Sequence, residues 1–401
     1  MSFNFNHFRF WVNRRIIQSP RLADWVYRGA YHFNWLAALT RDTRAKLFPV
    51  PLAEIQNFSK QLLGGQLLIG TTNICNARCT FCAYPRAVDN KTLKTGVMPM
   101  ATFQKVITER VRDGGASVDL TPVVGDPLID PGLLDKIKFA RQAGIREVCF
   151  TTNGILLLHQ DMYKHVVDSG VAAMYISIGA TDETNYREVY GVNQYAKVIN
   201  GLHKLLEYNR QQGEPVYINF RFRNAQRPSE ILTSDDFIRF IKPYLSKKVE
   251  VNFTVDFDNW GGVIRQEELP GHMRLRKPRP EVKIPCFSLF SYAVRFDGSV
   301  RLCGCRMQAT DMDDLVVGNI NHQTMKEIAD SEAARKIISG FYSGNRPETC
   351  KKCTMYTPIT RSWLAQRNAA SATAAASAPA ATPAPTVAPQ PAPAESPLVN
   401  K

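Results

Sequence analysis

Between residues 65 and 257, short apolar runs rich in strand-forming residues alternate with stretches that have helical spacing. This alternation predicts a parallel sheet whose strands are joined by right-handed helical crossovers. The runs are apolar enough for strands that are buried on both faces. The expected strands are residues 66–72, 117–124, 146–152, 172–178, 216–223 and 249–257, and the expected helices are residues 100–112, 132–143, 160–169, 195–209 and 234–245.

Two architectures fit this alternation, a doubly wound open sheet and a partial barrel of strands and helices. Periodicity alone does not separate them. In both, ligands bind beyond the carboxyl ends of the parallel strands. Side chains that follow the predicted strands are therefore the first candidates for a functional site.

The first 65 residues are aromatic and basic, with nine Arg and Lys against three Asp and Glu. Residues 8–17 and 22–39 each have the spacing of an amphipathic helix. Arg and Asn interrupt the apolar stretches, so this is not a secretory signal. We expect a helical cap packed on the main domain, and a peripheral membrane or partner contact is the alternative.

The last 33 residues, from Ala369, are mostly Ala and Pro. Such a segment cannot bury enough apolar surface to offset its ordering entropy, so a disordered tail is expected. No apolar run reaches the roughly 18 residues that span a bilayer. The basic run at residues 274–279 is either a solvated linker or an attractor for a phosphorylated or acidic substrate. It lacks a nucleic-acid-binding motif, so no nucleic acid partner is expected.

Seven of the nine cysteines lie in tight groups near residues 75–82, 303–305 and 350–353. Grouped thiols in a chain without an export signal are typical of metal or cluster ligands in a reducing compartment. A cytoplasmic location is therefore expected.

The first group follows the first predicted strand and has the spacing C-x3-C-x2-C, formed by Cys75, Cys79 and Cys82. Three thiols on one loop can converge on a four-iron cluster, which takes four ligands, so one iron stays open for another molecule. A zinc site would need a fourth Cys or His nearby, and the next histidine along the chain is His159. Polar residues between the thiols argue against three cysteines that are merely buried.

This loop resembles the signature of the radical S-adenosylmethionine (SAM) enzymes, with Phe81 at the aromatic position before the last cysteine. The resemblance implies an α/β fold with a partial (β/α)6 barrel, which chooses between the two architectures. It also implies that the open iron of a [4Fe-4S] cluster binds SAM, and that the reduced cluster cleaves SAM to methionine and a 5′-deoxyadenosyl radical. A reductant such as flavodoxin or ferredoxin is an implied partner.

The resemblance extends to residues after the later strands. Gly125 and Asp126 stand where the family holds the amino group of SAM, and Phe81, Asn153 and Ser177 are further expected cofactor contacts. Tyr190 replaces an arginine that is common in the family, so the SAM carboxylate needs another cation. The candidates for that cation are Arg187, Arg221 and Arg223.

A second constellation consists of Cys286, Cys303, Cys350 and Cys353. Four thiols in two pairs suit either a structural zinc ion or a second four-iron cluster. The spacing C-x11-G-x4-C resembles the C-terminal extension called SPASM, or its shorter relative called twitch, with a β-hairpin at residues 296–303 and a helix beyond it. The full SPASM pattern needs three more cysteines after residue 353, and this sequence has none there. The resemblance therefore implies a twitch-like form with one auxiliary [4Fe-4S] cluster.

Two cysteines are left over. Cys149 lies inside the third predicted strand and is expected to be a core thiol. Cys305 follows Cys303 by two residues and is a hydrogen donor, an alternate ligand or inert, with the inert interpretation favoured.

The predicted domains are a basic, aromatic N-terminal helical extension (1–62), the barrel (63–265), the auxiliary domain (266–367) and the tail (368–401). The expected function is a radical SAM oxidoreductase that abstracts hydrogen from a small-molecule or carbohydrate-like substrate, with electron transfer through the auxiliary cluster. The alternatives are a peptide-modifying maturase of a ribosomally made natural product and a non-catalytic iron–sulfur scaffold or electron carrier. The N-terminal extension is short for a peptide-recognition domain, and an electron carrier needs no open iron.

Overall fold

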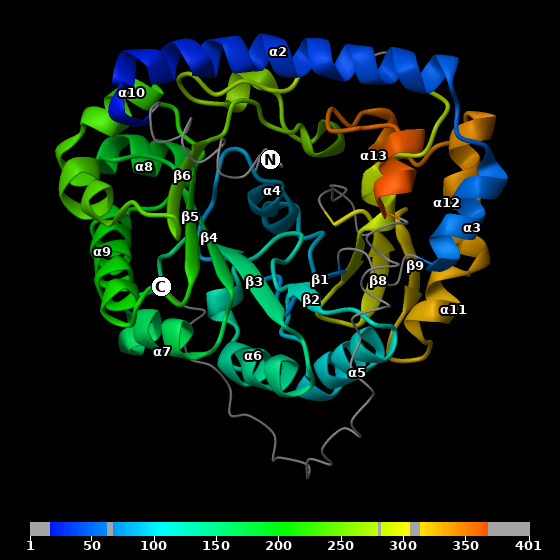
Figure 1. Ribbon diagram of the computed structural model, residues 1–401, viewed down its shortest axis with the longest axis horizontal. Coiled ribbons are helices and arrows are strands. Elements are labelled where there is room, and N and C mark those ends of the chain that lie inside the picture. The colour runs from blue at the N-terminus through cyan, green and yellow to red at the C-terminus, as the bar shows by residue number, and fades with distance from the viewer. Residues whose placement is uncertain (1–16, 62–66, 280–281, 305–312, 368–401) are drawn as a thin grey trace, which may run out of the picture.

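The computed structural model describes residues 17–61, 67–279, 282–304 and 313–367 (Figure 1). The Ala/Pro-rich tail, Cys305 and nearly all of the predicted helix at residues 8–17 lie outside the described residues. The predictions for those segments therefore remain predictions.

A single nine-stranded sheet organises the described chain, in the order β6-β5-β4-β3-β2-β1-β7-β8-β9. Neighbouring strands from β1 to β6 pair in parallel, as the alternation predicts. Each lies within a predicted run, and several are shorter because the chain leaves the ladder early to form loops at the carboxyl edge. These strands are β1 (Leu67–Ile69), β2 (Ser117–Asp119), β3 (Glu147–Thr152), β4 (Ala173–Ile178), β5 (Tyr217–Phe222) and β6 (Val249–Phe253).

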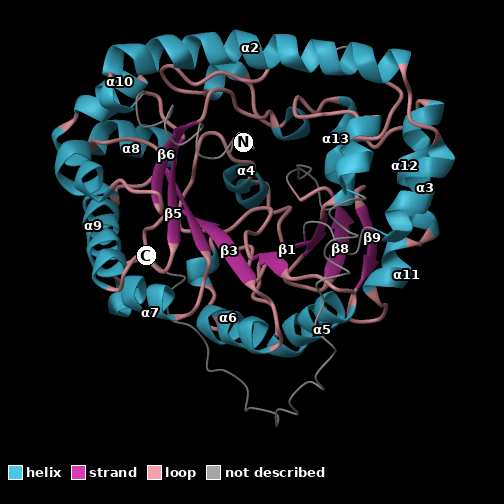
Figure 2. Ribbon diagram, viewed as in Figure 1, coloured by secondary structure: helices cyan, strands magenta, loops and turns pink. Residues whose placement is uncertain are grey.

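Helices surround the strands, which curve within the ring that Figure 2 shows. Four of the five predicted helices are present, as α5 (Met100–Arg112), α6 (Leu133–Gln142), α7 (Met162–Asp168) and α9 (Tyr195–Gln211). The prediction of a regular α-helix at residues 234–245 is wrong, because other helix types occur there. A π-helical turn, η4 (Phe237–Ile241), is followed there by a 3₁₀ turn, η5 (Lys242–Tyr244). Pro243 lacks a backbone donor and cannot continue a regular helix.

The two faces of the barrel strands differ, which corrects the expectation of burial on both faces. In β4, Met174, Ile176 and Ile178 are fully buried toward the helices, whereas the alternate residues are half-buried. β5 carries Asn219 and Arg221 on its other face. Because successive side chains point to opposite faces, the concave side of the sheet is lined with polar groups.

The C-terminal part extends the same sheet. β7 (Tyr292–Val294) pairs in parallel with β1 and antiparallel with β8 (Ser299–Leu302), which pairs with β9 (Val316–Asn319). Gly298 takes a φ of +80° in the predicted Asp-Gly turn. Three helices follow, α11 (Met325–Ala329), α12 (Glu332–Ser343) and α13 (Glu348–Lys351). The expected hairpin and helix are therefore present.

Two N-terminal helices, α2 (Pro20–Leu47) and α3 (Leu52–Gln61), precede the barrel. In Figure 1, α2 crosses the open side of the ring from α10 (Pro228–Thr233) toward α12. Its Asp24 accepts hydrogen bonds from Ser229 at the start of α10, and Tyr27 donates to the carbonyl of Thr254 at 3.0 Å. Near its other end, Asp42 pairs with Arg279 at 3.2 Å. α2 is therefore packed on the main domain, as a cap would be.

The hydrogen bonds of Asp24 allow a prediction of how much the anchoring of α2 contributes to the free energy of unfolding. Its carboxylate accepts from the Ser229 backbone N–H at 2.9 Å and from the Ser229 hydroxyl at 2.6 Å. Asp24→Ala removes both bonds and should lower the free energy of unfolding by about 1–3 kcal/mol, measured by urea denaturation. Glu207→Ala, which breaks an exposed pair with Lys204, is the control and should cost below about 1 kcal/mol. Equal losses in the two variants would show that α2 is not anchored there.

Candidate functional site

The cysteine loop leaves β1 and ends at α4 (Tyr84–Asp89), which lies inside the ring in Figure 1. The Tyr84 hydroxyl accepts from the Cys75 N–H at 3.1 Å and donates to the Cys75 carbonyl at 3.2 Å. The Tyr84 N–H donates to the Cys82 sulfur at 3.4 Å. The first turn of α4 therefore closes the loop and holds its first and last cysteines.

The three thiols of this loop form one group. Burial raises the pKa of Cys75 to about 12, and it raises those of Cys79 and Cys82 in the same direction. The charges of Cys82 and Cys75 also raise the pKa of Cys79. Such effects weaken with distance, so the three sulfurs lie near one another. This donor set fits an iron cluster, whose ligands are thiolates.

The C-terminal end of α8 (Glu183–Tyr190) forms backbone hydrogen bonds with the cysteine loop. The N–H of Arg78 donates to the carbonyl of Tyr190 at 2.9 Å, and the N–H of Thr80 donates to that of Val189 at 3.0 Å. Gly191 ends the helix with a φ of +66°, and a Cβ there would meet the Arg78 carbonyl at 2.7 Å. Sequence reasoning missed this contact, although a glycine after a helix is a known signal for its end.

The loop after β2 lies directly against the cysteine loop. The Asp126 N–H donates to the carbonyl of Ile74 at 2.9 Å. Gly125 has a φ of +120°, and a Cβ there would lie 2.9 Å from backbone atoms of Asn73. Only glycine tolerates both that conformation and that close approach.

The Asp126 carboxylate is buried and bonded within the protein. It accepts from the N–H of Leu128 at 3.0 Å, from the Thr152 hydroxyl at 2.9 Å and from the Asn153 N–H at 2.7 Å. Burial raises its pKa to about 6, although these hydrogen bonds act in the opposite direction. In the structure, Asp126 joins the loop after β2 to the end of β3. Its contact with the SAM amino group stays a prediction.

Two further predicted contacts reach the edge of the thiol group. The Asn153 amide donates to the side chain of Asn76 at 2.8 Å and lies 3.9 Å from the Cys75 sulfur. Ser177, on β4, shares a 2.8 Å hydrogen bond with the hydroxyl of Tyr190. The carboxyl ends of β3 and β4 thus meet the cysteine loop.

The three candidate cations are placed differently. Arg223 lies over the ring of Phe81 at 5.2 Å, and its charge lowers the pKa of Cys79 and Cys82. The Nε atom of Arg223 is buried without a hydrogen-bond partner. Arg221 instead lies over the ring of Tyr175 at 3.9 Å, and Arg187 is exposed on α8. Of the three, Arg223 is the one that the structure brings to the cysteine loop.

A cavity of about 350 Å³ opens on the concave side of β4, β5 and β6. Sequence reasoning missed it, although polar residues at every second position of β5 were a usable signal. Most of the side chains around it are polar. The cavity is lined by Tyr175, Tyr217, Asn219, Arg221, Asn252, Phe253 and Thr254.

The expectation of a core thiol at Cys149 is wrong. Cys149 is half-buried on β3, between the fully buried Val148 and Phe150. Because strand side chains alternate, its neighbours take the positions that face the helices. Burial raises the pKa of Cys149 to about 12, and the charges of Asp119 and Arg221 act on it. It therefore belongs to the concave side, near the residues that line the cavity.

The four C-terminal cysteines form a second thiol group. Burial raises the pKa of Cys286 to about 12, and the charges of Cys303 and Cys353 raise it further. The pKa of Cys350 is raised by burial and by the other three cysteines. Cys350 thus responds to the charges of the other three cysteines, as a ligand of a shared cluster would.

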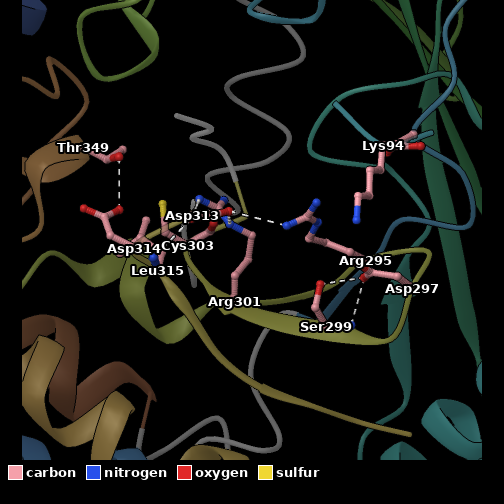
Figure 3. A network of polar contacts seen from close by, with 11 residues as sticks. Lys94, Arg295, Asp297, Ser299, Arg301, Cys303, Asp313, Asp314, Leu315 and Thr349 are labelled. Atoms are coloured by element: carbon pink, nitrogen blue, oxygen red, sulfur yellow. Dashed lines mark hydrogen bonds and ion pairs between the residues drawn. The ribbon is translucent and has the colours of Figure 1, made fainter. Parts of the chain in front are cut away.

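Buried polar contacts support this second group, as Figure 3 shows. Arg301 is 1% exposed and pairs through Nε with Asp313 at 2.7 Å, and it also donates to the carbonyl of Cys303. Cys303 itself has a φ of +69°. The Thr349 hydroxyl donates to Asp314 at 3.2 Å. The segment that follows β8 is thereby tied to the helix that carries Cys350.

Among the described residues, no group of three or more His, Cys, Asp or Glu side chains is arranged to hold a single metal ion. Cys305 lies outside the described residues, so the interpretation of Cys305 as inert remains a prediction. Iron and zinc at the second thiol group are distinguished by metal analysis.

Comparison with known families matches both parts of the chain that carry the thiol groups. Residues 69–220 match the model of the radical SAM superfamily. The chain therefore carries a radical SAM domain. Residues 286–354 match the SPASM model, an iron–sulfur cluster-binding domain. The predicted resemblance, the SAM-binding [4Fe-4S] cluster and the auxiliary iron–sulfur site are confirmed, while the domain boundaries and the ligand assignments remain predictions.

Similar proteins match only part of this chain. A GTP 3′,8-cyclase of Clostridium perfringens (strain SM101 / Type A) is 32% identical over 147 residues, which are 36% of this chain and 43% of that protein. The GTP 3′,8-cyclase of Alkaliphilus oremlandii (strain OhILAs) is 28% identical over 189 residues, 46% and 54% of the two chains. The chain therefore spans about half the length of these relatives.

Two solved structures are also similar. BtrN in complex with AdoMet and 2-DOIA has 16% identity and a TM-score of 0.45, covering 72% of this chain and 92% of that one. Native anSMEcpe with bound AdoMet has 14% identity and a TM-score of 0.47, covering 77% and 96%. Within the described residues, no helix is long and apolar enough to cross a membrane.

The two thiol groups predict the metal content. Anaerobic reconstitution should load about eight irons per chain if each group, as predicted, holds one four-iron cluster. Cys82→Ala and the double variant Cys350→Ala/Cys353→Ala should each retain about four irons. Elemental analysis for iron and zinc makes the measurement. About four irons with one zinc ion in the unmodified enzyme would instead make the C-terminal group a zinc site.

Proposed function

We propose that this enzyme is a radical SAM oxidoreductase that abstracts hydrogen from a small, polar, carbohydrate-like molecule bound in the concave cavity. The observation that carries this proposal is the cavity itself, at about 350 Å³ with a polar lining. Its volume lies near the lower end of the range for small-molecule sites. The cavity and the cysteine loop share the concave side of one parallel sheet.

In this proposal, Cys75, Cys79 and Cys82 hold the cluster that binds SAM. That cluster, when bound and reduced, supplies the cleavage of SAM that yields a 5′-deoxyadenosyl radical. The loop is held in place by the Tyr84 hydroxyl at one end and by the C-terminal carbonyls of α8 at its middle. The protein therefore contributes a fixed position for the three thiols.

We assign Arg223 to the carboxylate of SAM. Its buried Nε atom has no partner, and its charge acts on two of the three thiols. A guanidinium in this state is suited to an acceptor such as a carboxylate. Phe81 packs beneath Arg223, while Asn153 and Ser177 lie at the rim of the thiol group and are proposed SAM contacts.

The polar lining favours a substrate with several hydroxyl or phosphate groups. Asn219 and Asn252 offer donors and acceptors, and Arg221 offers a cation that is held over Tyr175. Sugars, aminocyclitols and nucleotides all fit that description. A maturase for a ribosomally made peptide is the alternative, and it would need an extended groove rather than a cavity of this volume.

The auxiliary cluster has the proposed ligands Cys286, Cys303, Cys350 and Cys353. Four protein thiolates leave it no open position, so its proposed role is to accept the electron of the substrate radical. Flavodoxin or ferredoxin is the proposed reductant, and a reducing compartment such as the cytoplasm is the proposed location. A non-catalytic scaffold would not cleave SAM.

The origin of the abstracted hydrogen tests the substrate class. Extract from cells grown on deuterated medium is divided by ultrafiltration into small molecules and larger material. Half of each fraction is treated with protease and half is left untreated. The reconstituted enzyme, SAM and dithionite are added without oxygen. We expect deuterium in the 5′-deoxyadenosine formed with the protease-treated small-molecule fraction, detected by mass spectrometry.

Cys82→Ala is the control and should give no 5′-deoxyadenosine, because it lacks a proposed ligand of the cluster. Deuterium transfer that occurs only with untreated larger material would favour the peptide maturase. An iron-loaded enzyme that forms no 5′-deoxyadenosine with any fraction would favour the scaffold.

We also propose that the outward face of α2 contacts an anionic lipid surface. The face is aromatic and apolar, with Trp25 at 74% exposed, Phe33 at 70% and Leu36 at 55%. Its exposed cations are Arg21, Arg28, Arg44 and Lys46.

No acidic side chain opposes these cations on the described length of α2. Its two acidic residues are turned toward the protein, Asp24 to Ser229 and Asp42 to Arg279. This combination of outward rings and cations is typical of helices that lie on anionic membranes.

Co-sedimentation with lipid vesicles tests this contact. The enzyme should bind vesicles of phosphatidylcholine and phosphatidylserine, and not vesicles of phosphatidylcholine alone. Trp25→Ser/Phe33→Ser removes the two most exposed rings and should weaken binding by about tenfold or more. The control Ile238→Ser changes an exposed apolar residue on η4 and should bind as before. Unchanged binding in the α2 double variant would refute the contact.

A further inference from the structure

A second cavity lies between α2 and the segment that follows β6. Its volume is about 230 Å³. The α2 side contributes Tyr31, Trp35 and Arg41, and the facing segment contributes Asp256 and the basic run at residues 276–279. None of the residues that line it falls within residues 69–220 or 286–354, the ranges that match the two family models.

The lining of this cavity has an excess of positive charge. Arg41, Arg276, Lys277 and Arg279 line it, against the single carboxylate of Asp256. Asp256 is engaged with Arg276 at 2.7 Å. Arg279 makes a 3.2 Å contact with Asp42, the residue that follows Arg41 on α2. Arg41 and Lys277 therefore face the cavity without an acidic partner in it.

Two guanidinium groups leave donors unused in the interior. The side chain of Arg279 is 3% exposed, and its Nη2 atom is buried without a hydrogen-bond partner. The Nε atom of Arg41 is buried and unpartnered in the same way. Buried donors of this kind normally have partners. The Oδ2 atom of Asp42, which pairs with Arg279 through its other oxygen, is a nearby carboxylate atom that is also buried without a partner, so the described residues leave these donors room for a further acceptor.

The cations also act on one another. The pKa of Arg41 is lowered first by burial and then by the charge of Arg279, while the charge of Asp42 raises it and that of Arg276 lowers it further. Gathering like charges in a partly buried space is unfavourable unless an anion compensates them.

We propose that this cavity binds a phosphoryl group, held by the guanidinium groups of Arg41 and Arg279 and by the ammonium of Lys277. Planar guanidinium groups match the oxygens of a phosphate, and a lysine adds a mobile point charge. The cavity has room for a phosphate or a diphosphate but not for a large ligand. The site is additional to the proposed hydrogen abstraction and does not depend on it.

The phosphoryl group has two possible sources, a soluble phosphorylated molecule or the headgroup of a lipid. The two rings that line the cavity, Tyr31 and Trp35, are half-buried and lie on a different side of α2 from the exposed Trp25 and Phe33. A cavity on the protein side of the helix favours a soluble ligand.

Isothermal titration calorimetry with pyrophosphate tests the site on the cluster-loaded enzyme in a phosphate-free buffer. We expect one saturable site per chain, whose affinity falls as salt is added. Arg41→Gln removes a cation that has no acidic partner in the cavity, and it should weaken binding by about tenfold or more. The matched control Arg28→Gln removes an exposed cation from the same helix and should leave the affinity unchanged.

A second variant guards against misfolding. Asp42→Asn/Arg279→Gln removes both charges of the buried pair together, so no unpaired charge is left, and it should also weaken binding. Iron content and far-UV circular dichroism report the fold of each variant. No saturable binding to the unmodified enzyme, or full affinity in both the Arg41 and the Arg279 variants, would overturn the proposal.

Vesicles that contain phosphatidic acid distinguish the two sources. With a soluble ligand, Arg41→Gln should lose pyrophosphate binding and keep vesicle binding. Loss of vesicle binding together with pyrophosphate binding would assign the site to a lipid headgroup. Both results retain the phosphoryl site, and neither bears on SAM cleavage.

Discussion

The parallel pairing of β1 to β6 is the constraint on which the rest of the structure depends. Because all six strands run in the same direction, their carboxyl ends meet at one edge. That edge collects the cysteine loop after β1, Asp126 after β2, Asn153 after β3 and Arg223 after β5. Residues that are up to about 150 positions apart in the chain thereby surround three thiols that lie within a run of eight residues.

Part of this arrangement is local and was predictable from the sequence. The spacing of Cys75, Cys79 and Cys82 lies within one loop, and the strands follow from alternating apolar runs. The contacts that hold the loop are not local. The α8 carbonyls and the Trp260 side chain, which donates to the Phe81 carbonyl at 2.8 Å, come from far along the chain. The spacing of residues in the sequence does not predict these hydrogen bonds, because they depend on how distant segments are arranged in the folded sheet.

Other sequence predictions failed or stayed open because they depended on which face of the sheet or helix a side chain occupies. Cys149 faces the concave side because its neighbours Val148 and Phe150 occupy the helix side, so its apolar context in the sequence was misleading. Among three arginines with equal claims in the sequence, Arg223 is placed over Phe81 while Arg187 is exposed. The amphipathic pattern of the N-terminal segment predicted a helix. The cationic cavity beneath that helix could not be predicted, because it forms only where α2 packs against residues 276–279.

The central claim is that the three-thiol loop leaves one iron open for SAM. Electron–nuclear double resonance on the reduced enzyme, with SAM that carries ¹⁵N in its amino group and ¹⁷O in its carboxylate, measures this contact directly. The account predicts hyperfine couplings to both labels in the unmodified enzyme and in Cys350→Ala/Cys353→Ala, and none in Cys79→Ala. A fully iron-loaded enzyme that binds SAM but shows no coupling to either label would contradict it.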